Sequence, residues 1–430
     1  MLDIVLFREN PDIIKESEKR RFRSTDNVDK VIELDQVWRD KRKEFDTLRS
    51  QRNSLSKQIG ALKKKKQNTE ADKIQAQVKE INEKAKKIEE EATAAEVERD
   101  QIRYKIGNIL HESVPDAEDE EGNGLVRKGG KPVKASFHKS HADLVELLDV
   151  VNLEKAAEVA GARTYYLKKD LVFLNLALVQ YALDFLVNEK GYEPYWTPYF
   201  LRKEVMKAAA ELGDLEEQLY SEPNEDVYFI ATSEQPLAAL HYNELLEEEH
   251  LPLKYCGFST NFRREAGSHG KDTKGIFRVH QFDKIEQFIF CKPEDSWALH
   301  EELISNAEAL FKGLELPYRI VNIASGELND NAAKKYDLEV WFPTQNTYRE
   351  MVSCSNCTDY QARKLNVRMG RVGTDKKKEP VHTLNSTAIA TSRAICAILE
   401  NFQQEDGTVK LPKVLHPYMH GKTEIKAQTK

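Results

Sequence analysis

The sequence predicts an α+β protein in which a long antiparallel α-helical coiled-coil arm precedes a core of antiparallel β-sheet flanked by helices. Two observations favour this class. Apolar residues repeat at heptad spacing along 34–62 and again along 74–109, which is typical of two long paired helices. In the second half of the chain, short strand-like segments outnumber helical ones and follow one another closely, which favours antiparallel pairing.

The composition is that of a soluble, highly charged chain of 430 residues, with 32% charged residues and a net charge of −7. This charge excludes a generally basic coat for nucleic acid but allows local basic patches. Five thinly spread cysteines suit a reducing compartment. The first residues lack the features of a signal or transit peptide, and no run of eighteen apolar residues occurs. We therefore expect a cytoplasmic protein without a membrane segment.

Residues 1–112 predict an N-terminal domain that carries the arm at about 30–110. A short strand or turn should precede a helix that starts at Pro11, with Asn10 as its cap. The arm would be about 40 Å or more in length. Its tip is either the solvated end of a dimerisation or spacer coiled coil or a contact for a large polyanion. The turn at this tip contains Lys63, Lys64, Lys65 and Lys66.

Pro, Gly and acidic residues dominate 113–135, which predicts a linker before a core domain at 136–415 and a short flexible tail at 416–430. The core should begin with a short helix at 138–148. A strongly amphipathic helix at 170–190 should end at Gly191. The extended segment that follows contains two prolines, so it should lie at the edge of a sheet. This edge is either a dimer surface or a simple packing pair.

The rest of the core should be rich in strands. We expect strands at 227–230, 318–323, 337–342, 349–353 and 381–384, one long or two short strands within 276–290, a helix at 293–314, and a helix with small residues from Ala388 to Ser392 from which Arg393 projects. After the first strand, Thr232, Ser233 and Glu234 either grip a small polar ligand or begin a helix, with Thr232 or Ser233 as its cap.

The segment 262–286 holds the densest cluster of reactive side chains. Its two strands enclose a glycine-bearing polar loop at 266–275, which we expect to be mobile. Arg263 and Arg278 suit bidentate contacts to phosphate. The ring of Phe282 offers a flat face to a base. We interpret this hairpin as a platform for the phosphates of a nucleotide.

Two further patterns concern metals. Glu350 and Ser353 lie on strand-like alternation, and both can offer oxygens to a hard cation such as Mg²⁺. Cys354 and Cys357 have a C-x-x-C spacing that invites a zinc or redox interpretation. No second pair completes a four-ligand site, so the pattern favours two ordinary thiols.

Taken in order, these segments resemble the class II aminoacyl-tRNA synthetases, and more closely the seryl-tRNA synthetases of the eukaryotic cytosolic type. The resemblance covers nearly the whole chain. Its three motifs are GYEPYWTP, which ends at Pro198, the hairpin from FRRE to RVHQF, and the segment that ends in Arg393. In the third motif Ser392 stands where the class usually has Glu, and Ser386, Ala388 and Ala390 stand at its small positions. Such substitutions suit the seryl branch.

The resemblance implies a homodimeric ligase with a class II synthetase-like sheet. It implies that ATP and Mg²⁺ convert L-serine to seryl-adenylate and that the seryl group passes to the 3′ end of tRNA(Ser), and of tRNA(Sec) where present. Neither an active-site zinc nor an editing domain is expected. The arm would grip the tRNA through Lys63, Lys64, Lys65 and Lys66.

The resemblance also implies a role for each motif residue. Arg263 and Arg393 would be catalytic. The ATP-binding residues would be Arg263, Arg264, Glu265, Arg278, Val279, His280, Gln281, Phe282, Glu350, Met351, Val352, Ser353 and Arg393, with Mg²⁺ held by Glu350 and Ser353. The serine-binding residues would be Thr232, Ser233, Glu234, Arg263, Glu286, Asn385 and Thr387.

Two other functions stay open at this point. The first is a paralogue that adenylates serine but does not charge tRNA, and the intact basic arm argues against it. The second is a non-enzymatic coiled-coil RNA-binding protein or scaffold. Such a protein would have no need for the combination of Arg263, Glu265, Phe282, Glu350 and Arg393.

Overall fold

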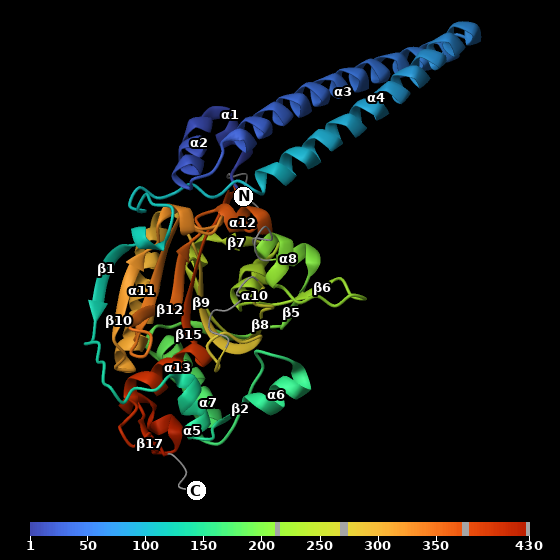
Figure 1. The fold of residues 1–430 in the computed structure, drawn as a ribbon. Coiled ribbons are helices and arrows are strands. Elements are labelled where there is room, and N and C mark those ends of the chain that lie inside the picture. The colour runs from blue at the N-terminus through green and yellow to red at the C-terminus, as the bar shows by residue number, and fades with distance from the viewer. Residues whose placement is uncertain (211–215, 267–273, 372–377, 427–430) are drawn as a thin grey trace. The chain divides into compact units, whose positions relative to one another are not determined.

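The computed structural model describes residues 1–210, 216–266, 274–371 and 378–426. The described residues form two compact units (Figure 1). One is Leu2–Gly107, and the other is Asn108–Lys430 together with Met1. Most of the loop expected at 266–275 lies outside the described residues.

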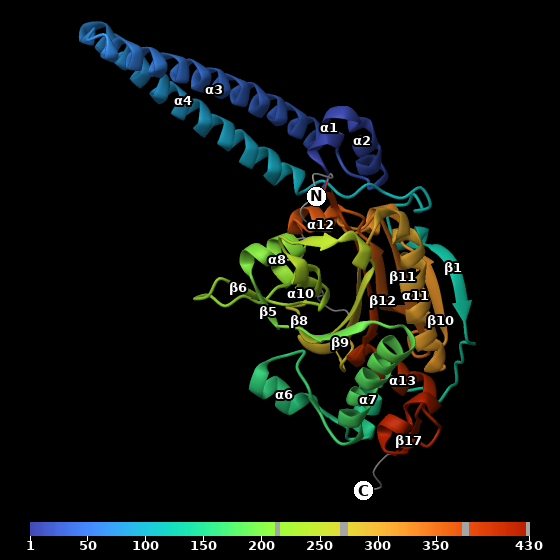
Figure 2. The same ribbon diagram turned by 180° about the vertical axis from the view of Figure 1, so that it is seen from behind.

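The N-terminal unit is helical. It contains α1 (Ile4–Glu9), α2 (Pro11–Arg20), α3 (Asp26–Lys64) and α4 (Asn68–Arg103). The last two run antiparallel as one arm (Figures 1 and 2), as the heptad pattern predicts. At 1.5 Å per residue, α3 is about 58 Å long. The second helix ends at Arg103, before the last two residues of the predicted apolar series.

The start of the chain differs from the prediction. Residues 4–9 form a helix rather than a strand or turn, because the side chain of Asp3 accepts the N–H of Val5 and caps it. Pro11 begins the next helix as predicted. Asn10 stands at the cap position of that helix but makes no capping bond through its side chain.

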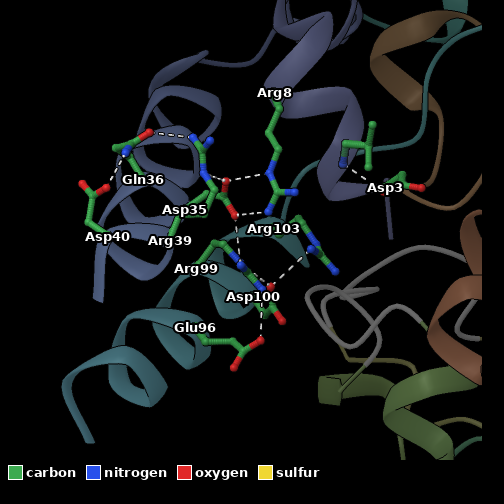
Figure 3. A network of polar contacts seen from close by, with 11 residues as sticks. Asp3, Arg8, Asp35, Gln36, Arg39, Asp40, Glu96, Arg99, Asp100 and Arg103 are labelled. Atoms are coloured by element: carbon green, nitrogen blue, oxygen red, sulfur yellow. Dashed lines mark hydrogen bonds and ion pairs between the residues drawn. The ribbon is translucent and has the colours of Figure 1, made fainter. Parts of the chain in front are cut away.

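The root of the arm is built on one buried carboxylate. Asp35 on α3 accepts two bonds from Arg8, at 2.8 and 2.9 Å, and one from Arg99 on α4, at 3.0 Å. The guanidinium of Arg39 lies 3.1 Å away. Figure 3 shows these side chains turned toward Asp35 from three helices. Burial alone would raise the pKa of Asp35, but the arginines, Arg8 first, hold it below its usual range.

The C-terminal unit is built on a large mixed sheet. Within the described residues it has eight strands in the order β1-β10-β11-β12-β15-β9-β8-β4, and all neighbours are antiparallel except β4 and β8. The strands are β1 (Gly124–Gly129), β10 (Tyr318–Asn322), β11 (Lys334–Phe342), β12 (Thr347–Asn356), β15 (His382–Ala390), β9 (Gln281–Cys291), β8 (Leu253–Phe262) and β4 (Glu193–Trp196). This confirms the predicted fold class and the edge position of the proline-rich segment.

Helices cover both faces of the sheet (Figures 1 and 2). On one face α7, α11 and α13 pack on the central strands, and on the other α8, α10 and α12 cover one end. The helices are α5 (His141–Leu147), α6 (Leu153–Ala160), α7 (Asp170–Asp184), α8 (Lys203–Ala209), α10 (Glu234–Ala238), α11 (Ser296–Gly313), α12 (Tyr360–Leu365) and α13 (Thr391–Phe402).

Short elements complete this unit. A π-helical turn, η2 (Phe185–Glu189), extends α7, and 3₁₀ turns are η1 (Glu120–Gly122), η3 (Glu216–Gln218), η4 (Ala239–His241), η5 (Glu248–His250), η6 (Pro293–Asp295), η7 (Ser325–Glu327), η8 (Lys413–Leu415) and η9 (Pro417–Met419). The small strands are β2 (Val151–Asn152), β3 (Tyr166–Leu167), β5 (Phe200–Arg202), β6 (Val227–Phe229), β7 (Leu245–Glu247), β13 (Arg368–Gly370), β14 (Glu379–Pro380), β16 (Val409–Lys410) and β17 (Glu424–Ile425).

Four predicted segments differ in the structure. The expected linker contains β1, which pairs with β10, and the expected tail contains β17, which pairs with β16. The second strand of the arginine hairpin starts at Gln281 rather than Ile276. The small residues through Ala390 continue β15, where a helix had been expected, because the ladder to β9 runs on through Ile389 and Ala390.

The helix α7 and the π-helical turn after it form the most apolar helical stretch of the core. Among the described residues, the stretch Asp170–Glu189 is long and apolar enough to cross a membrane by length and composition alone. Half of its most apolar window is buried within the protein, as in the core helix of a soluble domain. Gly191 follows it with φ +72°, which matches the predicted glycine end.

Candidate active site

A polar cavity of about 400 Å³ lies on one face of the central strands. Alternate residues of β9 decide which side chains reach it. Phe282, Lys284 and Glu286 line the cavity, whereas Gln287 bonds to α11 on the opposite face. This division follows from the two-residue period of a strand. Residues that are far apart in the sequence therefore meet over β9, β12 and β15.

Arg263 stands at the end of β8 with its guanidinium in this cavity. Its Nε donates to the carbonyl of Ala231 at 3.1 Å, and its Cζ lies 5.3 Å from the centre of the Phe282 ring. Burial, with the nearby charge of Arg393, lowers the pKa of Arg263 from its usual value. A guanidinium remains charged despite such a shift, so the cavity contains a fixed cation ready for an anion.

Two more arginines line the same cavity, and each contacts a carboxylate. Arg278 lies 3.6 Å from Glu265. Arg393, in the first turn of α13, donates to the backbone carbonyl of Glu350 at 3.0 Å and lies 3.6 Å from its carboxylate. Burial would raise the pKa of Glu350, but Arg393 and other cations outweigh it and lower the pKa.

Phe277 is a second aromatic residue of the cavity, which the sequence analysis did not single out. The guanidinium of Arg393 lies 5.2 Å from the centre of its ring, and that of Arg349 lies 4.6 Å away. Arg393 thus lies over Phe277, while Arg263 lies over Phe282. Together these rings and guanidinium groups offer flat and charged surfaces of the kind that bind a nucleotide.

The other end of the cavity is suited to a smaller polar molecule. Glu234 accepts from the amides of Asn385 and Gln361, each at 3.2 Å. Thr387 donates to Glu286 at 3.3 Å. Thr232 belongs to the same lining, and its hydroxyl oxygen accepts the N–H of Glu234 at 3.1 Å. Thr232 and Glu234 thus line the cavity, while Ser233 stands at the N-cap position of α10 without a capping bond from its side chain.

Lys284 is a charged residue of this end that the sequence analysis missed. Its Nζ lies 2.6 Å from Glu286 and 2.6 Å from the hydroxyl of Thr232. Lys284 lies two residues from both Phe282 and Glu286, so it shares their face once the strand and its register are known. The ammonium group of this lysine therefore lies on the same face of the strand as the predicted Phe282 and Glu286.

Oxygen atoms suitable for a cation lie where Mg²⁺ is expected. Glu350 and Ser353 both line the cavity, and Asp337 pairs with Ser353 across β11 and β12. One oxygen of Asp337 is buried without a hydrogen-bonding partner in the described part of the chain. Burial, and then the Glu350 and Glu339 carboxylates against the pull of Lys335, raise the pKa of Asp337 to about 7. This set of oxygens fits a hard divalent cation.

The C-x-x-C pair does not form such a site. Cys354 and Cys357 are buried thiols that are not joined in a disulfide. The amide of Asn385 approaches the sulfur of Cys357 at 3.6 Å. No group of three or more His, Cys, Asp or Glu side chains within the described ranges is placed to hold a metal by itself.

The structure brings most of the predicted site residues together. The predicted residues that line the cavity are Thr232, Glu234, Arg263, Glu265, Arg278, Val279, Phe282, Glu286, Glu350, Met351, Ser353, Asn385, Thr387 and Arg393. The predicted lysines Lys63, Lys64, Lys65 and Lys66 are all exposed at the tip of the arm.

Five predicted residues do not line the cavity. Ser233 is buried and donates to the carbonyl of Gly257, and Val352 belongs to the apolar core. His280 supports the backbone of Arg263, since its carbonyl accepts the Arg263 N–H at 2.9 Å. Arg264 and Gln281 are exposed. Inside the cavity these five residues can affect a ligand only through their neighbours. Direct contacts require a ligand that extends beyond the cavity.

Comparisons with known proteins agree on one family. Residues 216–402 match the model of the tRNA synthetase class II core domain (G, H, P, S and T), and residues 1–110 match that of the seryl-tRNA synthetase N-terminal domain. The serine–tRNA ligase of Methanosphaera stadtmanae is 52% identical over 429 residues, which cover 100% of both chains. The cytoplasmic serine–tRNA ligase of Arabidopsis thaliana is 47% identical and covers 100% of this chain and 97% of its own length.

Solved structures give the same result. The seryl-tRNA synthetase from Pyrococcus horikoshii, complexed with ATP, superposes with a TM-score of 0.92 at 45% identity and covers 100% of both chains. The cytoplasmic serine–tRNA ligase from Naegleria fowleri, in complex with AMP, has a TM-score of 0.88 at 45% identity. That match covers 100% of this chain and 99% of the other.

Proposed function

The chain belongs to the seryl-tRNA synthetase family, and on this premise we propose how its residues perform the family's reaction. Its activity is that of a serine–tRNA ligase of class II: ATP activates L-serine to seryl-adenylate, and the seryl group passes to tRNA(Ser). The observation that carries the assignment of residues is the single cavity in which three arginines and two aromatic rings adjoin a small pocket lined by hydroxyl, carboxylate and amide groups.

The arginine-rich end would hold ATP. Arg263 would bind the α-phosphate together with the carboxylate of serine, and Arg278 would bind the rest of the bent triphosphate. Phe282 offers its ring to adenine, with Arg393 on the other side of the base or on the γ-phosphate. Glu265 would contact the edge of the adenine or the amine side of the site. These positions are supported by the shared cavity and by the ATP-bound relative from Pyrococcus horikoshii.

The smaller end would hold serine. Thr232 and Glu234 lie on the side where the resemblance puts the ammonium group. Glu286, Asn385 and Thr387 would surround the hydroxyl. A buried site that must hydrogen-bond a hydroxyl leaves polar groups unpaired when alanine binds, which disfavours alanine by a factor of about 10⁴–10⁵.

The first step needs positioning and charge stabilisation rather than a base. An oxygen of the serine carboxylate, already ionised, attacks the α-phosphorus, and the bond from that phosphorus to the bridging oxygen of pyrophosphate breaks. Arg263 is placed to stabilise the charge that develops on the phosphoryl oxygens. In the second step a hydroxyl of the terminal ribose of tRNA attacks the carbonyl carbon, and AMP leaves as the hydroxyl proton is released.

Mg²⁺ is proposed for the ATP end, at Glu350 and Ser353. A cation held by these residues would supply positive charge that offsets the charge of the phosphates. The partnerless oxygen of Asp337 beside Ser353 supports a cation at this place. Zinc is not proposed.

The N-terminal unit is proposed to bind tRNA. Its domain would span 1–112 and the catalytic domain 136–415, while the segments expected as a linker (113–135) and a tail (416–430) contribute β1 and β17 to the C-terminal unit. The match of residues 1–110 to the seryl-tRNA synthetase N-terminal domain supports this role. The exposed Lys63, Lys64, Lys65 and Lys66 would contact phosphates of the tRNA, because cationic side chains supply most of the non-specific affinity for nucleic acid.

We also propose a homodimer. Apolar side chains are exposed on the edge strand β4 and on α7, including Trp196 at 74% exposure and Leu176 at 57%. Such side chains near an unpaired strand edge suit contact with a second copy of the chain. Trp196 lies in GYEPYWTP, the segment that resembles the first class II motif, and α7 with Leu176 precedes this segment. This position supports the surface over others.

We make two further proposals, one on the location of the protein in the cell and one on its branch of the family. We propose a cytoplasmic protein of the eukaryotic cytosolic type. The cytoplasmic Arabidopsis thaliana relative and the seryl-type residues of the third motif support it. Relatives at 46–52% identity include archaeal and plant enzymes, so the identities support a group that contains both.

The proposed function is tested by ATP–pyrophosphate exchange with each of the twenty amino acids in turn. We expect exchange with serine alone at concentrations near its KM. Exchange with no amino acid, or with a different one, would exclude the assignment. Charging of tRNA(Ser) with labelled serine then tests the second step and separates a ligase from a protein that only forms the adenylate.

A further inference from the structure

A lysine lies inside the pocket proposed for serine. Lys284 is on β9, and its side chain is only 8% exposed. Its polar contacts in the described part of the chain are with Glu286 and Thr232, both at 2.6 Å. Lysine is rarely buried unless its charge is paired. Since both partners belong to the cavity, the lysine serves the pocket rather than the packing of the sheet.

The contact with Glu286 gives the two oxygens of that carboxylate different surroundings. Lys284 and Thr387 both contact Oε2. Oε1 has no hydrogen-bonding partner within the described residues, and Glu286 lines the cavity. The ammonium of Lys284 also compensates the negative charge. Glu286 thus offers one oxygen as an acceptor while its charge is already paired, which suits a neutral donor such as a hydroxyl better than a second ammonium.

The contact with Thr232 fixes the direction of its hydroxyl. The oxygen of Thr232 accepts from Lys284 and from the backbone N–H of Glu234, at 2.6 and 3.1 Å. A hydroxyl has two acceptor positions and one hydrogen. With both acceptor positions used, Thr232 can only donate. The pocket therefore has a donor at Thr232 and an acceptor at Glu286, both next to one ammonium.

From these contacts we propose that Lys284 is a specificity-determining residue of the amino-acid pocket. It makes Glu286 a hydrogen-bond acceptor and Thr232 a hydrogen-bond donor. The hydroxyl of a substrate side chain needs both, because it donates one hydrogen bond and accepts another. This changes the part assigned to Thr232 above, and it leaves the ammonium of serine to Glu234. The inference rests on the proposed function, because it concerns how the same cavity selects serine.

The test compares Lys284→Met, which removes the charge and both donors, with Lys284→Gln, which keeps a donor, and Lys284→Arg, which keeps the charge. Lys254→Met is the matched control, since Lys254 pairs with Glu302 at 2.7 Å from the neighbouring strand and does not line the cavity. The measurements are the KM values for serine and ATP in pyrophosphate exchange, and the ratio of kcat/KM for serine to that for alanine. Thermal unfolding and binding of a non-hydrolysable ATP analogue check that each variant is folded.

For Lys284→Met we expect the KM for serine to rise about 10- to 100-fold, because two polar groups of the pocket lose their partner. The preference for serine over alanine should fall at least tenfold, while the KM for ATP and the analogue affinity stay within twofold. Lys284→Gln and Lys284→Arg should fall between this variant and the wild type, and the Lys254→Met control should match the wild type.

Two outcomes would overturn the proposal. One is a folded Lys284→Met whose serine KM and preference over alanine equal those of the wild type. The other is loss of folding in all three Lys284 variants, because the lysine would then serve stability. Failure of the proposed function is distinct from both, since in that case the wild-type chain itself would show no exchange with serine.

Discussion

At the scale of single residues, the site consists of arginines, carboxylates and hydroxyls that strands far apart in the sequence bring into one cavity. Most of these groups could be predicted from the sequence through the resemblance of its motifs to a known family. Lys284 and Phe277 could not. A lone lysine in a strand usually points to solvent, and a lone Phe usually packs in a core. Only the register of β9 and the turn before it bring them into the cavity. Ser233 shows the opposite case, because its hydroxyl is used by the carbonyl of Gly257.

The guanidinium of Arg263 gives the first prediction at this scale. Arg263→Lys keeps the charge but loses the planar fork, so it cannot contact a phosphate and a carboxylate in the same way. We expect serine-dependent pyrophosphate exchange to fall by about 10²–10³. Arg202→Lys on β5 is the control, because Arg202 is exposed and does not line the cavity. Equal activity of the two variants would contradict the role of Arg263.

At the scale of elements, the long helices and most strands follow from apolar periodicity, and their ends and exceptions do not. The small residues of β15 favour a helix by local preference, but β9 pairs with the strand as far as Ala390, while β12 pairs with it only at 384–386. The strand β1 was hidden in a segment rich in Gly and acids, and its pairing partner lies almost two hundred residues later. Contacts of this range leave no mark on a local pattern.

The root of the arm gives a prediction for the helices. Asp35→Asn removes the negative charge among Arg8, Arg39 and Arg99. We expect the N-terminal unit to lose about 3–5 kcal/mol of unfolding free energy, as when one partner of a buried ion pair is removed. Asp40→Asn is the control, because Asp40 is exposed on the same helix (Figure 3). Denaturant unfolding checks both.

The effect of pH on this variant follows from the pKa of Asp35. That pKa is lower in the folded state than in the unfolded state, so the stabilisation is present above the unfolded value of about 3.9. It is lost as the pH falls through the folded value. The difference between wild type and Asp35→Asn should therefore shrink in acid. A difference that is independent of pH would mean that packing, and not charge, holds the root together.

At the scale of the whole molecule, the division of labour between an arm and a catalytic unit was predictable, because heptads and alternating strands occupy different parts of the chain. The residues at which the arm can be shortened without removing its root could not be predicted from the sequence. The pairs Lys41–Glu91 and Glu44–Lys84 show which residues of α3 and α4 face each other. Asp35 and Arg99 pair with each other at the root of the arm, so a deletion that includes them would remove the root as well.

The arm should be separable from serine activation. Removing 45–83 and joining the helices by a short glycine-containing turn keeps the root and deletes the lysine tip. We expect charging of tRNA(Ser) to fall by at least tenfold while serine-dependent pyrophosphate exchange stays within twofold, because the tip contributes phosphate contacts only. Charging at different salt concentrations checks this, since the wild type should depend on salt more steeply. Loss of both activities would contradict a separable arm.

The proposed dimer surface gives a second prediction at this scale. Leu176→Lys puts a charge on the exposed face of α7 and should shift the chain toward a monomer in analytical ultracentrifugation. Leu125→Lys is the matched control, because Leu125 is 60% exposed on β1 at the opposite edge of the sheet, close to the 57% of Leu176. A wild-type monomer, or an equal effect of both variants, would place the contact elsewhere.

One cavity joins serine to ATP in the proposed reaction, so the intermediate that stays bound there can be identified. The full chain is mixed with ATP, Mg²⁺ and an equimolar mixture of serine, alanine and threonine, and the small molecules that remain bound are analysed by mass spectrometry. We expect seryl-adenylate, with pyrophosphate released in equal amount. Alanyl- or threonyl-adenylate in comparable amount, or no adenylate from a folded protein that binds ATP, would contradict it.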